Sequence, residues 1–156
     1  LYVNLEPCSH HGKTPPCADL IVEHKIPRVV IGSGDPNPLV AGKGVERLRK
    51  AGVEVTEGVL HEACEFLNRR FFMYHRRQRP YVILKWAQSS DGYMAPEGDE
   101  QYWLTGEQSK QLVHQWRTQE QAVLVGTRTA LIDNPQLTAR LWQGTQPLRV
   151  VLDKDL

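Results

Sequence analysis

The chain has 156 residues, of which 40% are apolar and 24% charged, and its formal net charge at pH 7 is +1. This balance is ordinary for a globular protein, and it gives no electrostatic reason to expect a nucleic-acid or membrane partner. No apolar run reaches the length of a membrane span, and three cysteines are too few for a disulfide framework. We therefore expect a cytoplasmic protein whose clustered cysteines bind metal.

The first half of the sequence alternates predicted strands and helices. Apolar and β-branched runs predict strands, and longer amphipathic runs predict helices, in the chain order 1–5, 14–25, 28–32, 44–52, 53–55 and 60–75. Thr14 is expected to cap the helix at 14–25, with Pro15 and Pro16 in its first turn. An alternation of this kind favours a parallel α/β sheet.

The second half follows a basic run at 76–79 and Pro80, a sequence typical of a linker. Strands are predicted at 81–87, 122–126 and 148–153, and Thr105 with Gln108 three residues later predicts a helix start. Because the chain begins and ends on predicted strands, whose bare edges natural domains avoid, we expect it to be a window from a longer protein.

Metal-binding residue types are concentrated in the stretch LEPCSHHGKTPPCADLI, residues 5–21. Cys8 comes just after a predicted strand, and Cys17 falls in a first helical turn, where the helix dipole favours a thiolate. A catalytic zinc needs three protein ligands. The spacing alone leaves open a catalytic zinc site, a structural zinc clip of Cys8, Cys17, His10 and His11 in a non-catalytic binding module, and a polar loop with two unligated cysteines.

A longer pattern narrows these alternatives. Pro7 and Cys8 match the P-C of zinc deaminases, although the second cysteine lies nine residues on instead of three. The run from Glu6 to Cys17 fits E-P-C-x-H-x-G-x-T-P-P-C, and GDPNP follows at 34–38. With LKWAQSSDGYMA, QYWLTG and VGTRTALIDNPQLTAR in the second half, the sequence resembles the bifunctional riboflavin-biosynthesis deaminase/reductases on both sides of Pro80.

This resemblance implies an α/β fold in two parts. Residues 1–78 would be the C-terminal part of a cytidine-deaminase-like three-layer zinc domain, and residues 79–156 the N-terminal part of a dihydrofolate-reductase-like domain. The implied activity is zinc-dependent hydrolytic deamination of a diaminopyrimidinone ribosylamine 5′-phosphate, followed by NADPH-dependent reduction of its ribosyl group to ribityl. The expected partners are this small molecule and a second copy of the chain through the reductase half. The near-zero net charge disfavours a nucleic-acid editing deaminase.

In the first half, the resemblance assigns zinc binding to Cys8 and Cys17. The third ligand and the proton-carrying Glu of the family belong to an H-A-E motif that this sequence lacks, so we expect them before Leu1. Substrate contacts are implied for His10, Lys13, Asp35 and Asn37. The alternative roles are a solvated charge for Lys13 and turn formation for Asp35 and Asn37, and Glu6 is expected to be structural.

In the second half, the resemblance divides the candidate residues between cofactor and substrate. NADPH contacts are implied for Ala87, Trp103, Thr129 and Asp133, and substrate contacts for Gln101, Arg117, Leu137 and Arg140. Guanidinium groups suit the phosphate of such a substrate, because they bind it in a bidentate manner. The alternatives are a core position for Trp103, a helix-surface charge for Arg117 and a turn role for Asp133. Without the missing parts, we expect this segment to be inactive by itself.

Overall fold

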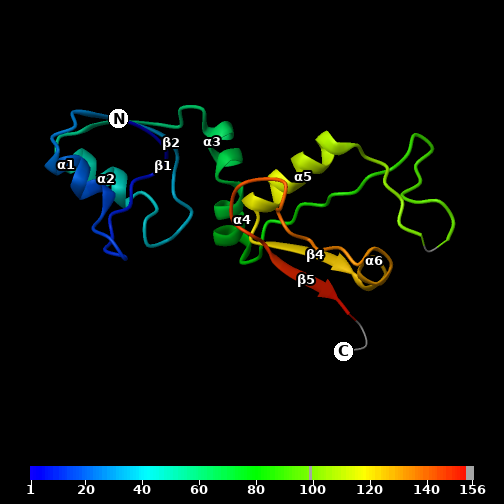
Figure 1. The fold of residues 1–156 in the computed structure, drawn as a ribbon. Helices are drawn as coiled ribbons and strands as arrows, with labels where there is room; N and C mark the ends of the chain where they lie inside the picture. The colour runs from blue at the N-terminus through cyan, green and yellow to red at the C-terminus, as the bar shows by residue number, and fades with distance from the viewer. Residues whose placement is uncertain (99, 154–156) are drawn as a thin grey trace. The chain divides into compact units, whose positions relative to one another are not determined.

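A computed structural model describes residues 1–98 and 100–153, which divide into two compact units, Leu1–Ile83 and Leu84–Leu156 (Figure 1). The first unit is built on three parallel strands in the order β1-β2-β3. Their bounds are β1 Tyr2–Leu5, β2 Arg28–Ser33 and β3 Glu54–Glu57, and the helices of the unit are α1 Cys17–Glu23, α2 Lys43–Lys50, α3 His61–Leu67 and α4 Arg69–Arg77. The parallel α/β sheet predicted for this half is present.

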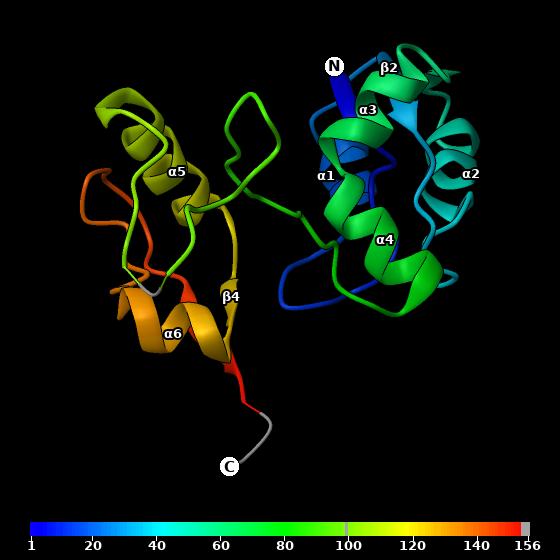
Figure 2. The ribbon, with the colours of Figure 1, turned by 90° about the vertical axis from the view of Figure 1, so that its right-hand side faces the viewer.

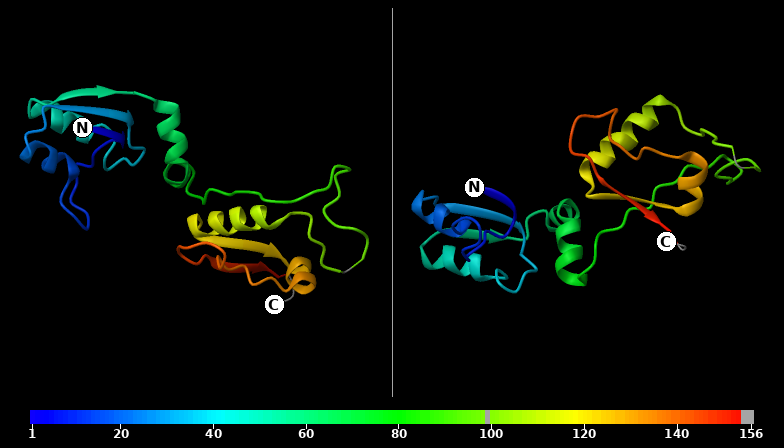
Figure 3. Two further views of the ribbon diagram at one scale, coloured as in Figure 1. Left: turned by 45° about the horizontal axis from the view of Figure 1, so that its top comes forward. Right: turned by 60° about the horizontal axis from the view of Figure 1, so that its bottom comes forward.

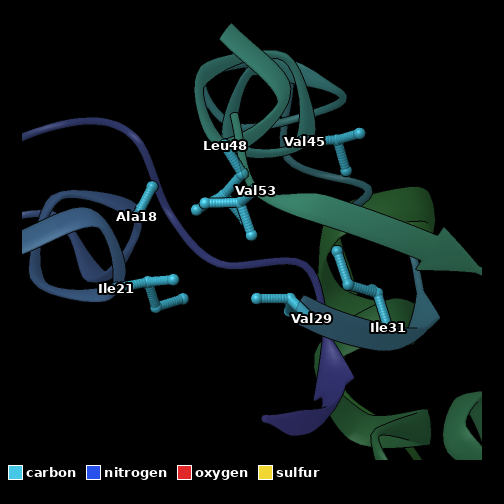
Figure 4. Packing of buried hydrophobic residues seen from close by; sticks show 7 residues of the cluster. All are labelled: Ala18, Ile21, Val29, Ile31, Val45, Leu48 and Val53. Atoms are coloured by element: carbon cyan, nitrogen blue, oxygen red, sulfur yellow. The ribbon is translucent and has the colours of Figure 1, made fainter. Parts of the chain in front are cut away.

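Helices cover both faces of the central strand β2. On one face, Val29 and Ile31 join a buried cluster with Ala18 and Ile21 of α1, Val45 and Leu48 of α2, and Val53 (Figure 4). Side chains alternate along a strand, so Gly32 faces the other side. There a Cβ atom on Gly32 would lie 2.2 Å from the Cys64 sulfur of α3. This unit therefore has three layers, with the sheet in the middle.

The second unit has a smaller sheet and fewer buried apolar side chains. Its elements are α5 Glu107–Gln119, β4 Ala122–Gly126, α6 Thr127–Asp133 and β5 Leu148–Leu152 (Figure 2). The strands β4 and β5 lie side by side and run parallel (Figure 3). Their register runs from Ala122 opposite Leu148 to Gly126 opposite Leu152. Leu137, Ala139 and Pro147 are the buried apolar residues of its described part.

Two helix boundaries differ from those predicted, one at a run of prolines and one at an asparagine. Helix α1 begins at Cys17, not at Thr14, and Pro16 at its N-cap has an extended backbone. A residue that precedes proline is pushed out of the helical region, which excludes Thr14 and Pro15. The single helix predicted at 60–75 is divided at Asn68 into α3 and α4, and the Asn68 Nδ2 donates to the Cys64 carbonyl at 2.9 Å.

Two predictions for the second half are wrong. The apolar run 81–87 is not a strand, because a strand needs a hydrogen-bonding neighbour and the described sheet of this unit contains β4 and β5 alone. Helix α5 begins after Gly106 without a side-chain cap, so Thr105 does not form the predicted capping box. In the described part of the chain, no helix combines the length and the apolar character that a membrane crossing requires.

Candidate metal and substrate sites

The fold brings Cys8 and Cys17 together. Cys8 follows the carboxyl end of β1, and Cys17 is the first residue of α1. The Cys17 backbone N–H donates to the Cys8 sulfur at 3.3 Å, and the Ala18 N–H donates to the Cys8 carbonyl at 3.1 Å. A strand end and a helix start thus hold two thiols side by side, at the edge of a parallel sheet where α/β proteins commonly bind ligands.

The chemistry of this pair suits a soft metal ion. A hydrogen bond with the Cys8 thiol, then burial and then the charge of Cys8, raise the pKa of the Cys17 thiol, which is opposite to the direction expected from its place at a helix start. Adjacent sulfur donors of this kind are typical zinc ligands, so the two cysteines fit two positions of a zinc ion. Among residues 1–98 and 100–153, no three His, Cys, Asp or Glu side chains gather closely enough to hold a metal.

The loop between the cysteines carries three of the residues considered from the sequence. His10 is partly buried, whereas His11 and Lys13 are exposed. The His10 Nδ1 atom is buried and has no hydrogen-bond partner in the described structure. A buried polar atom without a partner is costly, so His10 has an unused hydrogen-bonding position in this loop.

Asp35 and Asn37 shape a turn after β2. Asp35 Oδ1 accepts the Asn37 N–H at 2.8 Å, and Asn37 Oδ1 accepts the Leu39 N–H at 3.0 Å. These are the turn contacts expected of Asx residues. The Asp35 Oδ2 and the Asn37 amide nitrogen take no part in them, so the turn role does not exclude a contact with substrate.

In the second unit, three of the candidate substrate residues lie around one short segment, 137–141. Arg117 of α5 is half-buried, and its Nη1 donates to the Thr138 carbonyl at 2.9 Å. Arg140 Nη1 donates to the Thr138 hydroxyl at 3.4 Å. Leu137 is buried, with a left-handed backbone at φ 53°. Arg117, Leu137 and Arg140 are therefore neighbours, whereas Gln101 is an exposed residue in the irregular stretch before α5.

His114 lies beside these arginines, and no role was predicted for it from the sequence. His114 is buried in α5, and its Nδ1 accepts the Leu141 N–H at 3.3 Å. Burial, followed by the charges of Arg117 and Arg140, lowers the pKa of His114. Burial and the charge of Arg140 also lower the pKa of Arg117. The sequence could have indicated this contact, because His114 stands three residues before Arg117 on one helix and such residues share a helix face.

The predicted cofactor residues are spread over the second unit. Trp103 is 58% exposed, and the Lys110 Nζ lies 4.4 Å from its ring centroid, so the alternative of a core position is wrong. Ala87 lies in the irregular segment, Thr129 is exposed on α6, and Asp133 ends that helix. In the part of the chain that the structure describes, no hydrogen bond or ion pair joins these four residues.

Known proteins match this chain along its length. Residues 80–156 match the family described as RibD C-terminal domain. The riboflavin biosynthesis protein RibD of Actinobacillus pleuropneumoniae is 52% identical over 155 residues, which cover 99% of this chain and 41% of that protein. RibD of Escherichia coli is 40% identical over 166 residues, covering 97% of this chain and 45% of that protein.

Solved structures give the same relationship. A diaminohydroxyphosphoribosylaminopyrimidine deaminase/5-amino-6-(5-phosphoribosylamino)uracil reductase from Thermotoga maritima matches with a TM-score of 0.89 and 50% identity, over 97% of this chain and 43% of that one. RibD from Acinetobacter baumannii matches with a TM-score of 0.89 and 42% identity, over 96% of this chain and 44% of that one. The chain thus spans less than half the length of these relatives.

Proposed function

Because this chain belongs to the RibD family, we propose that it carries parts of two catalytic domains of a riboflavin-pathway enzyme. Residues 1–78 belong to a cytidine-deaminase-like domain, and residues 79–156 to a dihydrofolate-reductase-like domain. The reaction is hydrolytic deamination of a diaminopyrimidinone ribosylamine 5′-phosphate, followed by reduction of its ribosyl group by NADPH. The observation that carries the proposal is the pair of adjacent thiols at the end of β1 and the start of α1.

In the deaminase part, Cys8 and Cys17 would hold zinc as thiolates. A zinc ion held there would make hydroxide available at neutral pH. Around it, His10 offers an unpartnered ring nitrogen to the pyrimidine, and Lys13 offers its ammonium to the phosphate as a point charge. Asp35 and Asn37 orient the ribosyl arm with the atoms that their turn leaves free. Water replaces the amine on the ring carbon, and ammonia leaves with the proton.

In the reductase part, Arg117 and Arg140 bind the same phosphate. Each already makes a hydrogen bond to Thr138, so both guanidinium groups are held beside one segment before the substrate arrives. Leu137 contacts the substrate from that segment, and Gln101 from the stretch before α5. Ala87, Trp103, Thr129 and Asp133 would contact NADPH, which would supply the hydride for the ribosyl carbon. The bond from that carbon to the ring oxygen opens, and the oxygen takes a proton from solvent.

The proposal is tested by separating the two activities in a full-length RibD protein that carries this segment. Cys17→Ser should abolish ammonia release, because a hydroxyl is a poor replacement for a zinc-binding thiolate. NADPH oxidation with pre-deaminated substrate should persist. Arg140→Ala should leave ammonia release intact and raise the KM of reduction by about tenfold or more, since a charge-assisted hydrogen bond contributes roughly 1.5–3 kcal/mol.

Cys64→Ser is the matched control, because the Cys64 sulfur lies in α3 with the Val59 carbonyl 3.9 Å away. It should affect neither activity. Metal content is measured on every variant by elemental analysis. The proposal is wrong if folded Cys17→Ser loses reduction as completely as deamination, or if it deaminates at the wild-type rate.

A further inference from the structure

Glu6 is a buried carboxylate that accepts four backbone hydrogen bonds. Glu6 comes directly after β1 in the chain, and the residue is 5% exposed. Oε1 accepts the N–H groups of Gly44 and Val45 at 3.0 and 3.3 Å. Oε2 accepts the N–H groups of Gly42 and Asp35 at 3.0 and 3.2 Å. A charge that is buried in this way is stable only because its oxygens are hydrogen-bonded throughout.

The four donors lie far from Glu6 in the sequence, at and before the start of α2. No residue at the N-cap of this helix supplies a capping side chain. Gly44 and Val45 lie in the first turn of α2, where backbone N–H groups have no partner inside the helix. The N-cap residue of this helix is Gly42, which has no side chain and makes no side-chain cap. Glu6 therefore caps α2 from another loop, and its charge suits the positive end of the helix.

Glu6 also ties together the two loops that carry the proposed deaminase site. It stands two residues before Cys8, and it holds the Asp35 N–H, while the Asp35 side chain holds the N–H of Asn37. A second contact fixes the same spacing, since a Cβ atom on Gly44 would lie 1.8 Å from the Pro7 carbonyl oxygen. The end of β1 and the start of α2 are thus in contact around a single carboxylate.

We propose that Glu6 is a positioning residue for deamination: its carboxylate sets the Asp35–Asn37 turn relative to the Cys8 loop, and with it the binding of the ribosyl phosphate arm of the substrate. The inference rests on the proposed function. It gives Glu6 a role beyond the structural one expected from the sequence, because one of its four hydrogen bonds, from the Asp35 N–H, ends on the turn proposed to contact substrate.

The first experiment replaces Glu6 by Gln in a full-length RibD protein that carries this segment. Glutamine keeps the size of the side chain, but its NH2 group would face two backbone N–H donors, so one pair of hydrogen bonds is lost. The KM for ammonia release should rise about tenfold, which corresponds to about 1.4 kcal/mol, while kcat stays within about twofold. Zinc content and NADPH-dependent reduction should not change.

Glu46→Gln is the charge-matched control. Glu46 lies on α2 with a side chain 62% exposed, and it pairs with Lys50 at 2.6 Å. Its replacement should leave the KM of ammonia release unchanged.

A double-mutant cycle separates positioning from a purely structural role. If Glu6 acts through the turn, Glu6→Gln combined with Asn37→Ala should raise KM little more than Asn37→Ala alone. If the KM of the double variant instead rose by the product of the two single effects, the proposal would be overturned. So would a loss of kcat at constant KM, because that is the result of fewer folded molecules.

Hydrogen exchange gives a readout that does not need turnover. In Glu6→Gln, the backbone amides of residues 34–45 should exchange faster, and those of β4 and β5 should not. If the wild-type protein releases no ammonia, the proposed function fails, and unchanged exchange at 34–45 would then overturn the positioning role separately. Glu6→Asp, one methylene shorter, repeats these tests if Glu6→Gln does not fold. Failure of both variants to fold would assign Glu6 to structure alone.

Discussion

Replacing Gly44 by alanine should destabilise the first unit by about 3 kcal/mol. The added Cβ would lie 1.8 Å from the Pro7 carbonyl oxygen and 3.0 Å from its carbon, so the start of α2 must move by more than an ångström. That movement lengthens the hydrogen bonds from Gly44 and Val45 to Glu6, now 3.0 and 3.3 Å. Overfilling a tight site costs about 1–3 kcal/mol, and each charge-assisted hydrogen bond contributes roughly 1.5–3 kcal/mol.

Native-state hydrogen exchange measures this change in the unit where it occurs. The amides of Val29 and Ile31 lie in the middle strand of the covered sheet, and their slowest exchange reports unfolding of the first unit. All four tryptophans fall between residues 86 and 142, so their fluorescence in urea follows the second unit and should be unchanged by Gly44→Ala.

Gly12→Ala is the matched substitution, since a Cβ on Gly12 meets nothing within 4 Å. It should change the free energy of unfolding by less than about 0.5 kcal/mol. If Gly44→Ala were as harmless as Gly12→Ala, the close contact between Pro7 and α2 and the capping role of Glu6 would both be refuted.

Two further predictions concern the cores of the two units. Leu48→Ala removes a side chain that is 0% exposed and should lower the free energy of unfolding by about 2–5 kcal/mol, measured by the exchange of the Val29 amide; a loss below about 1 kcal/mol would contradict the packing described. His114 has a pKa below its ordinary 6.5, so the native state binds fewer protons than the unfolded state. Its contribution to the stability of the second unit should therefore be complete above pH 6.5 and be lost as the pH falls toward the lowered value. Tryptophan fluorescence in urea should show this loss at about pH 5 against about pH 8, and His114→Gln should flatten it; an equally steep pH dependence in the variant would assign the effect to other groups.

The sequence predicted strands correctly where an apolar run has a neighbouring strand to pair with. The strand β2 was expected at 28–32 and occurs at Arg28–Ser33, because a run of β-branched residues suits a covered strand. The strand β4 was expected and found at 122–126. The run 81–87 has the same apolar character, but no local pattern reveals whether a neighbouring strand will be present to pair with it.

In the candidate sites, too, features set by local patterns were predicted, and features set by distant contacts were not. Adjacency of Cys8 and Cys17 followed from a strand end and a helix start that the sequence already indicated. The role of Glu6 did not, because its hydrogen-bond donors lie from 29 to 39 residues away and are backbone groups, which carry no signature in the sequence. The contact between His114 and Leu141 spans 27 residues and is equally invisible to local patterns.

The strand pair β4–β5 has a consequence for how this molecule behaves at high concentration. Neither strand has a second neighbour in the described sheet, so each leaves a row of N–H and C=O groups open along its outer edge. Leu124, Leu148 and Leu152 on these strands are 62%, 68% and 66% exposed. Open edges with apolar side chains template the addition of further strands. Self-association of the segment by strand addition is therefore expected along β4 and β5, where open edges and exposed leucines occur together.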